Sequence, residues 1–228
     1  RLDLTATGRV ILAENGPPAL DINAKANSVP ASLANAFVPG LGARGTISGN
    51  VTTSGTPTAP SVHYDLTWAD AALAQTTAAG VSSLQIRATG EYADNRVTID
   101  TSLSGPSNLS LSGGGSVSLA GEKALDLRFD GQIPFAILAG QLASQGFVLE
   151  GTGTVDLAIA GTAAAPAITG TATSSSARLI DVRRNLAIDD LAANVTFNGD
   201  QASITSLTGN LSTGGSLAVA GSVGIAPG

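Results

Sequence analysis

The dominant pattern along the chain is strict alternation between branched apolar residues and small or polar residues. It is clearest over residues 96–100, 116–119, 154–160 and 216–219. Successive side chains of a β-strand point to opposite faces of a sheet, so this alternation predicts strands with one apolar face and one polar face. The Thr, Ser and Val residues of these runs also favour a pleated sheet. The pattern therefore predicts an all-β meander of many short strands.

Turn signals separate the alternating runs at short intervals. Asn15 with Gly16, residues 93–95, residues 198–200 and the glycine run 113–115 each predict a turn. Strands and helices do not alternate along the chain, which argues against a doubly wound parallel sheet.

Two segments, residues 29–37 and 133–142, carry apolar residues at helical rather than alternating spacing. The first segment includes Pro30 near its start and is followed by Gly40. The second includes Pro134 near its start and is followed by Gly146. This arrangement is typical of short helices, so we expect one short amphipathic helix in each segment. The apolar positions of the two helices are Val29, Leu33, Phe37, Ile133, Ile137, Leu138 and Leu142. The alanine-rich segment 69–79 predicts a third helix with a weaker apolar face.

The chain also contains an internal repeat of about 105 residues. Similar short segments recur in the same order, with residues 20–22 returning as 125–127, 29–30 as 133–134, 54–60 as 160–166 and 115–121 as 215–221. Residues 20–124 and 125–228 are therefore predicted to be two copies of one unit. Residues 1–19 are interpreted as the end of a preceding copy.

Composition excludes several classes of function. The 228 residues include no Cys, which rules out disulfides, thiolate metal sites and a cysteine nucleophile. The formal net charge of -6 argues against a nucleic-acid partner, which requires a basic face. No apolar run reaches the ~20 residues that cross a bilayer as a helix. The chain also has no Met, which favours its interpretation as a piece of a longer protein.

Residues that could carry catalysis are scarce, and we expect no enzyme activity, no cofactor and no metal. His63 is the only histidine and shares a predicted strand face with Asp65, but the serine elbow of a hydrolase is missing. One histidine without cysteine cannot supply the usual ligands of zinc. The glycine run 113–115 leads into neither a phosphate loop nor a calcium-binding repeat. His63 is interpreted as a surface residue, and the Arg183–Arg184 pair as a solvated turn.

The apolar face of the predicted strands is the remaining functional candidate. Burying one branched apolar side chain stabilises a protein by about 1.5–3 kcal/mol, so this face must be covered. Another part of the same sheet would produce a closed core, whereas an apolar ligand would occupy a long groove. The alternation leaves both possibilities open, and the low aromatic content of 4% slightly favours the groove because aliphatic walls suit acyl chains.

One set of segments has a recognisable sequence: residues 29–49, 54–60 and 209–221, and more loosely 133–138 and 160–166. In these segments the chain resembles the repeat of TamB-like translocation and assembly module proteins. It implies a segment of a long protein of the Gram-negative envelope, anchored in the inner membrane and crossing the periplasm. It also implies a curved antiparallel β-sheet coiled into a tube or taco with a hydrophobic interior, to which the spacing above adds one short amphipathic helix per repeat.

The resemblance further implies a role in outer-membrane protein assembly, with an outer-membrane barrel partner, and in phospholipid transport between the two membranes. It raises the weight of the groove interpretation, with phospholipid acyl chains as the ligand. The positions expected to face this lipid groove are the branched apolar members of the alternating strands and Phe129 and Phe197: Leu20, Ile22, Val97, Ile99, Val117, Leu119, Leu125, Leu127, Phe129, Val155, Leu157, Ile159, Val195, Phe197, Leu217 and Val219.

Two other interpretations of the sequence differ in class. A structural β-solenoid stalk of a secreted adhesin would repeat every 20–30 residues or so, which is much shorter than the repeat observed. A polysaccharide-acting β-helix enzyme would need a carboxylate cluster and aromatic platforms, and Trp68 is the only tryptophan. A repeat unit normally stacks on its neighbours, so we also expect end-to-end self-association at high concentration.

Overall fold

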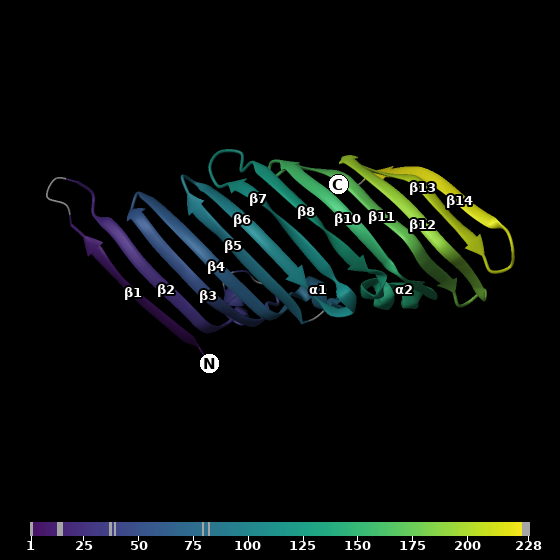
Figure 1. Ribbon diagram of the computed structural model, residues 1–228, viewed down its shortest axis with the longest axis horizontal. Helices are drawn as coiled ribbons and strands as arrows, with labels where there is room; N and C mark the ends of the chain where they lie inside the picture. The colour runs from purple at the N-terminus through teal and green to yellow at the C-terminus, as the bar shows by residue number, and fades with distance from the viewer. Residues whose placement is uncertain are drawn as a thin grey trace.

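The computed structural model describes residues 2–12, 16–36, 38, 40–78, 80–81 and 83–224 (Figure 1). Asn15 and Phe37, which belong to a predicted turn and a predicted helix, lie outside the described residues. The structure is 71% strand, and its strands form one antiparallel sheet that is not closed into a barrel. The all-β prediction is therefore confirmed.

The sheet is a meander in which strands pair in chain order, except that β9 pairs with β11. Its strands are β1 (Asp3–Ile11), β2 (Ala19–Pro30), β3 (Arg44–Thr56), β4 (Ala59–Ala72), β5 (Leu84–Ala93), β6 (Arg96–Ser104), β7 (Ser110–Ser118), β8 (Leu125–Pro134), β9 (Phe147–Glu150), β10 (Thr152–Gly161), β11 (Pro166–Asp181), β12 (Leu186–Gly199), β13 (Gln201–Leu211) and β14 (Ser216–Gly224). Every pairing is antiparallel between strands that follow closely in the chain. The stacked parallel coils of an adhesin solenoid do not fit this topology.

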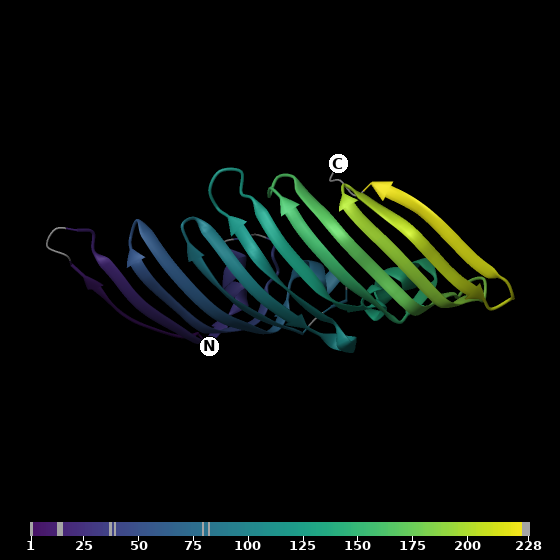
Figure 2. The same cartoon turned by 45° about the horizontal axis from the view of Figure 1, so that its top comes forward.

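The two long edges of the sheet differ in how the strands are connected. One edge carries hairpin turns such as residues 57–58 and 94–95. The opposite edge carries the helical segments of the described chain, which are η1 (Ala31–Ala36), α1 (Ala74–Ala78), η2 (Pro106–Asn108), η3 (Phe135–Leu138) and α2 (Ala139–Gln145). Figure 1 shows α1 and α2 along this lower edge, and Figure 2 shows how the strands curve above it.

The helical segments after β2 and β8 lie where the sequence predicts them, but the first is a 3₁₀-helix. Pro30 and Pro134 are the last residues of their strands, and each helical segment begins at the next residue. The second segment ends at Gly146, whose φ of 85° is the left-handed conformation that glycine adopts easily at the end of a helix.

The cross-strand register separates the sheet into two chemically distinct faces. Ile99 pairs with Gly90 and Gly115, whereas its chain neighbour Thr98 pairs with Glu91 and Ser116. Paired residues of an antiparallel sheet point to the same side, so these rows can be followed from strand to strand. We call the side of Ile99 the apolar face and the side of Thr98 the polar face.

Most of the buried apolar residues lie at the helical edge and not in the middle of the sheet. Ala71, Val81, Leu84 and Leu109 form a small cluster, against which Trp68 and other half-buried side chains pack. No large side chain of the described chain has less than 2% of its surface exposed. The fold therefore does not have the closed core of a two-layer β-sandwich.

Glycine residues allow neighbouring strands to approach closely on the apolar face. Gly115 has a φ of 137°, and a Cβ at this position would collide with the carbonyl oxygen of Asp126. Gly170 has a φ of 125° and lies in the same relation to the carbonyl of Asp156. Because glycine has no Cβ, it permits such close contacts within a strand. Glycines at such positions allow a strand to bend, which contributes to the curvature of a sheet.

Two predictions from local sequence are wrong in detail. The glycine run 113–115 is not a turn but the middle of β7, where a Cβ on Gly113 would collide with the ring of Phe129 on β8. Residues 69–72 are the end of β4 and not part of a helix, because Ala71 and Ala72 pair with neighbouring strands and are almost fully buried. Only residues 74–78 of the predicted third helix are helical. The boundaries of the predicted repeat remain a prediction.

Candidate functional site

The predicted groove residues lie together on the apolar face. Ile22 belongs to a row that runs through Thr53, Val62, Tyr92 and Val97. The row continues from Val97 to Val117 and Leu125. On the other half of the sheet, Phe129 pairs with Leu157, which connects through Gly170 to Phe197.

The remaining predicted positions follow the same register. Leu20, Ile99, Leu127, Val155, Ile159, Val195, Leu217 and Val219 lie on the apolar face with them. Leu119 is the exception, because it lies beyond the end of β7, where its N–H donates to the carbonyl of Asn95 at 2.7 Å and half of its surface is exposed.

One row of the apolar face crosses the sheet from β2 to β14 without interruption. Each member pairs directly with the next, in the order Val29, Ile47, Trp68, Ile86, Leu103, Leu111, Gly131, Val155, Ala172, Val195, Ile204 and Gly221. Every residue in this row is apolar or glycine. The sequence does not reveal this continuity, because the row depends on the register of each strand against its neighbour.

The polar face carries hydroxyls and exposed ion pairs. Arg87 on β5 pairs with Asp65 on β4 at 2.9 Å, and Arg178 on β11 pairs with Asp189 on β12 at 2.7 Å. Thr154 and Thr173 share a hydrogen bond of 2.7 Å across β10 and β11. Such exposed pairs contribute only about 0–1 kcal/mol each, so this face is a solvated surface.

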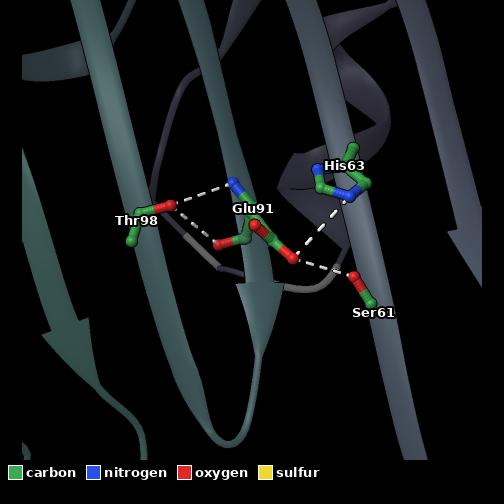
Figure 3. A network of polar contacts seen from close by, with 4 residues as sticks. All are labelled: Ser61, His63, Glu91 and Thr98. Carbon is green, nitrogen blue, oxygen red and sulfur yellow. Dashed lines mark hydrogen bonds and ion pairs between the residues drawn. The ribbon is translucent and has the colours of Figure 1, made fainter. Parts of the chain in front are cut away.

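His63 belongs to a polar network on this face, shown in Figure 3. Its Nε2 lies 3.7 Å from Oε1 of Glu91 on β5, and the hydroxyl of Ser61 donates to the same oxygen at 2.9 Å. Thr98 on β6 exchanges hydrogen bonds with the backbone of Glu91. Serine and histidine therefore both contact the carboxylate, whereas a hydrolase needs histidine between the serine and the acid. Asp65, which the sequence places beside His63, pairs with Arg87 instead.

The Arg183–Arg184 turn is tied to a buried acid that the sequence analysis missed. Asp181 accepts hydrogen bonds from the backbone N–H groups of both arginines, at 3.0 and 3.1 Å, and from the Arg184 guanidinium. The hydrogen bond from the Arg184 side chain is the main reason that the pKa of Asp181 is lower than its ordinary value, and burial of the carboxyl opposes the shift. An aspartate just before a turn is the signal that could have identified this cap.

A hollow on the apolar face lies between η3 and strands β8, β10, β11 and β12. Its volume is about 250 Å³. Its wall consists of Ile133, Phe135, Ile137, Leu138, Gly153, Thr154, Val155, Ala172, Thr173, Ser174, Ala193 and Val195. The sequence analysis included only Val155 and Val195 of this set among the groove positions. We call this hollow the η3 groove.

Among the described residues, no group of three or more His, Cys, Asp or Glu side chains is arranged to hold a metal ion. No helix in the described ranges is long and apolar enough to cross a membrane. The apolar face is thus the feature of the molecule that most needs a functional explanation.

An open antiparallel sheet with one continuous apolar face and helical segments along one edge defines a class of elongated, groove-forming β-proteins. The family model of the TamB C-terminal domain matches residues 3–212, and the chain belongs to this family. The resemblance stated from the sequence is therefore confirmed. The family is a structural and transport family of the cell envelope, associated with outer-membrane assembly and lipid transport. Searches of curated proteins and of solved structures gave no significant match.

Proposed function

We propose that the apolar face holds phospholipid acyl chains and guides them across the periplasm between the inner and outer membranes. The protein acts as one segment of a longer, inner-membrane-anchored envelope protein. The observation that carries the proposal is the unbroken apolar row from Val29 on β2 to Gly221 on β14. The row crosses the strands, so it follows the long dimension of the sheet.

The energetics of the apolar face favour an apolar ligand. Ile22 and Val219 keep 36% and 42% of their surfaces exposed, although both lie on this face. Covering apolar surface yields about 25 cal/mol per Å², and large continuous apolar surfaces are typical of ligand or partner sites. An acyl chain lying along the row would cover many such side chains together.

The absence of charge along the row suits movement of a ligand. None of the twelve side-chain positions in the row is charged, and neighbouring strands are about 4.8 Å apart. A methylene chain would therefore meet chemically similar surface at every step. Charged groups such as Arg87 and Asp65 lie on the polar face, where they pair.

Support of outer-membrane protein assembly is the second function that we propose for the same face. Strands of outer-membrane proteins alternate apolar and polar side chains, so their apolar side matches this surface. The outer-membrane barrel partner would act together with the parent protein.

Site-specific photocrosslinking in cells tests these proposals. A photoreactive phenylalanine derivative at Leu157, on the apolar face, should form adducts with phospholipid, whereas the same group at Ala158 should not. Ala158 is the matched control because it is the next residue of β10 and pairs with Arg128 on the polar face. Adducts of Leu157 with unfolded outer-membrane proteins, and none with lipid, would favour assembly over transport. Equal adducts at both positions would contradict both functions.

The sheet edges support the proposed end-to-end association. In the described part of the chain, β1 and β14 each pair with a single strand, and Leu4, Val10 and Val223 on them are more than half exposed. Pairing of β14 in one molecule with β1 in the next would extend the apolar face. Light scattering over a range of protein concentrations should show a rising mass, and a constant monomer mass at high concentration would contradict the proposal.

A further inference from the structure

The apolar face is filled at the helical edge of the first half of the sheet. Beside the first proline, Pro30, the paired residues are Val29, Ile47, Trp68 and Ile86, which all carry large side chains. The indole N–H of Trp68 donates to the carbonyl of Arg44 at 2.7 Å. The ring packs against the buried cluster that contains Leu84. Trp68 therefore fills this place with the protein's own side chain.

The corresponding place in the second half carries small residues. Beside the second proline, Pro134, Ile133 pairs with Gly153. On β11, Ser174 follows Thr173, which pairs with Thr154 on β10, and Ser174 pairs with Ala193 on β12. The hydroxyl of Ser174 donates to the carbonyl of Thr152 at 3.1 Å, so its only polar group is satisfied by the backbone. Ser174 thus takes the position that Trp68 has in the first half.

The η3 groove is the space that these small residues leave. A Cβ on Gly153 would lie 3.2 Å from the ring of Phe135, so this ring packs directly on the Gly153 backbone and closes one side. Ile137 and Leu138 of η3 also line the groove. Val155, Ala172 and Val195 line the groove and are also members of the long apolar row. The groove is therefore a side branch of the apolar face.

The chemistry of the wall selects the ligand. No charged residue lines the groove, and the described side chains include no buried polar atom without a hydrogen-bond partner. A polar group entering it would lose its bonds to water without replacement. An enclosed apolar cavity of about 150 Å³ accepts a small apolar molecule, so the larger volume here, about 250 Å³, leaves room for the end of an apolar chain. Val155, Ala172 and Val195 belong to both the groove and the row, so a linear chain that lies along the row can place its end in the groove.

We propose that the η3 groove holds the end of one phospholipid acyl chain, and that Trp68 is a built-in plug of the equivalent place in the first half. This inference rests on the proposed function of the apolar face. The groove gives the sheet a distinct holding site, where a lipid is retained more tightly than along the rest of the row. Ser174 and Trp68 determine which half of the sheet has that site.

Exchange of the two determining residues tests the proposal. Palmitoyl lysophosphatidylethanolamine is the probe, and isothermal titration calorimetry gives its affinity and the number of bound molecules. Ser174→Trp should fill the groove and weaken the tight site by about tenfold or more, which corresponds to loss of contact for a few methylene groups. Ser175→Trp is the matched control, because Ser175 is the next residue of β11 and is exposed. It should leave the affinity unchanged.

The reverse change tests the plug. Trp68→Ser should add a second tight site of similar affinity, provided that circular dichroism shows the sheet intact. If Trp68→Ser unfolds the protein, Trp68→Leu, which leaves a smaller hollow, replaces it and should add a weaker second site. An unchanged affinity in the Ser174→Trp variant would overturn the inference. So would displacement of the probe from wild-type protein by a peptide of alternating Leu and Ser but not by phospholipid.

These outcomes are distinguishable from failure of the proposed function. If Leu157 forms lipid adducts in cells while Ser174→Trp binds the probe normally, the apolar face carries lipid but the η3 groove is not a holding site. If neither position contacts lipid, the proposed function fails, and the inference fails with it.

Discussion

The ring of Tyr64 on β4 lies across Gly90 on β5, and its hydroxyl donates a hydrogen bond to the carbonyl of Thr98 on β6 at 2.8 Å. One side chain therefore ties three strands together. A Cβ on Gly90 would lie 2.5 Å from the Tyr64 hydroxyl oxygen and would also collide with the Thr98 carbonyl. An aromatic ring that covers a strand glycine on the next strand is a recurring way of stabilising curved sheets.

Gly90→Ala should destabilise the protein. The added methyl group meets backbone on one side and the Tyr64 hydroxyl on the other, so the expected loss in the free energy of unfolding is about 1–3 kcal/mol. Urea unfolding followed by circular dichroism measures it. Gly221→Ala is the control, because Gly221 lies in β14 with no atom within 4 Å of the added Cβ. A loss of stability as large for Gly221→Ala would show that the Tyr64 contact is not the cause.

Tyr64 should make stability fall at alkaline pH. Burial raises the pKa of Tyr64 above its ordinary value of 10.0. The folded state therefore keeps the phenol proton more tightly than the unfolded state, so its contribution is complete below pH 10 and is lost as pH rises through the folded pKa. Unfolding at about pH 8 and about pH 11 should show a smaller alkaline loss for Tyr64→Phe than for wild type. Identical losses in the two proteins would exclude Tyr64 as the titrating group.

Asp181 should contribute to stability at neutral pH but not in strong acid. Hydrogen bonding from the Arg184 side chain keeps the pKa of Asp181 below its ordinary value of 3.8. The contribution is therefore present above that value and is lost as pH falls through the folded pKa. Asp181→Ala should lower the melting temperature at pH 7 and lower it less at about pH 2.

Asp200→Ala provides the comparison for Asp181. Asp200 lies in the turn between β12 and β13 and makes no salt bridge within the described ranges. The Asp200→Ala variant should change the melting temperature little at pH 7 and at about pH 2. The interpretation of Asp181 would be wrong if its variant lost as much stability in acid as at neutral pH.

Asn35 should hold the segment after β2 in place. Its side-chain amide donates to the carbonyl of Ala43 at 3.1 Å, and its carbonyl oxygen accepts from the Ala43 N–H at 2.8 Å. Ala43 is almost fully buried, so Asn35→Ala would leave two backbone groups without partners at a cost of about 1–3 kcal/mol. Hydrogen exchange should show faster exchange of the Ala43 N–H. Ser32→Ala, at an exposed position of the same helical segment, should leave that rate unchanged.

Alternation predicted the strands and their faces because it reports directly on which side of a pleated chain meets water. Within a strand, adjacent residues such as Thr98 and Ile99 point to opposite faces, so the alternation alone assigns each of them to its face. The same holds for Asp156 and Leu157. The helical segments after Pro30 and Pro134 were equally visible, since proline ends the strand pattern and helical spacing follows. These features depend only on residues close in the chain.

The features that were missed depend on partners far apart in the chain. Ala71 and Ala72 favour a helix as isolated residues, but pairing with β3 and β5 and their burial keep them in a strand. Gly113 belongs to a glycine run that predicts a turn, but in the structure the ring of Phe129 occupies the space where a Cβ on Gly113 would lie. Gly153 and Ser174 both line the η3 groove, where their small size leaves space. The sequence does not reveal this, because the two residues lie on different strands and only the fold brings them to the same hollow.

The pairing of strands in chain order also links the length of the sheet to the number of its hairpins. Apart from the pairing of β9 with β11, every strand pairs only with its neighbours in the sheet order, so another hairpin would lengthen the sheet without changing the pairs already made. Each added hairpin contributes two strand spacings, or about 10 Å. The length of the apolar face is then fixed by the number of hairpins in the chain, and a deletion of whole hairpins should shorten the sheet while the pairing of the remaining strands is kept.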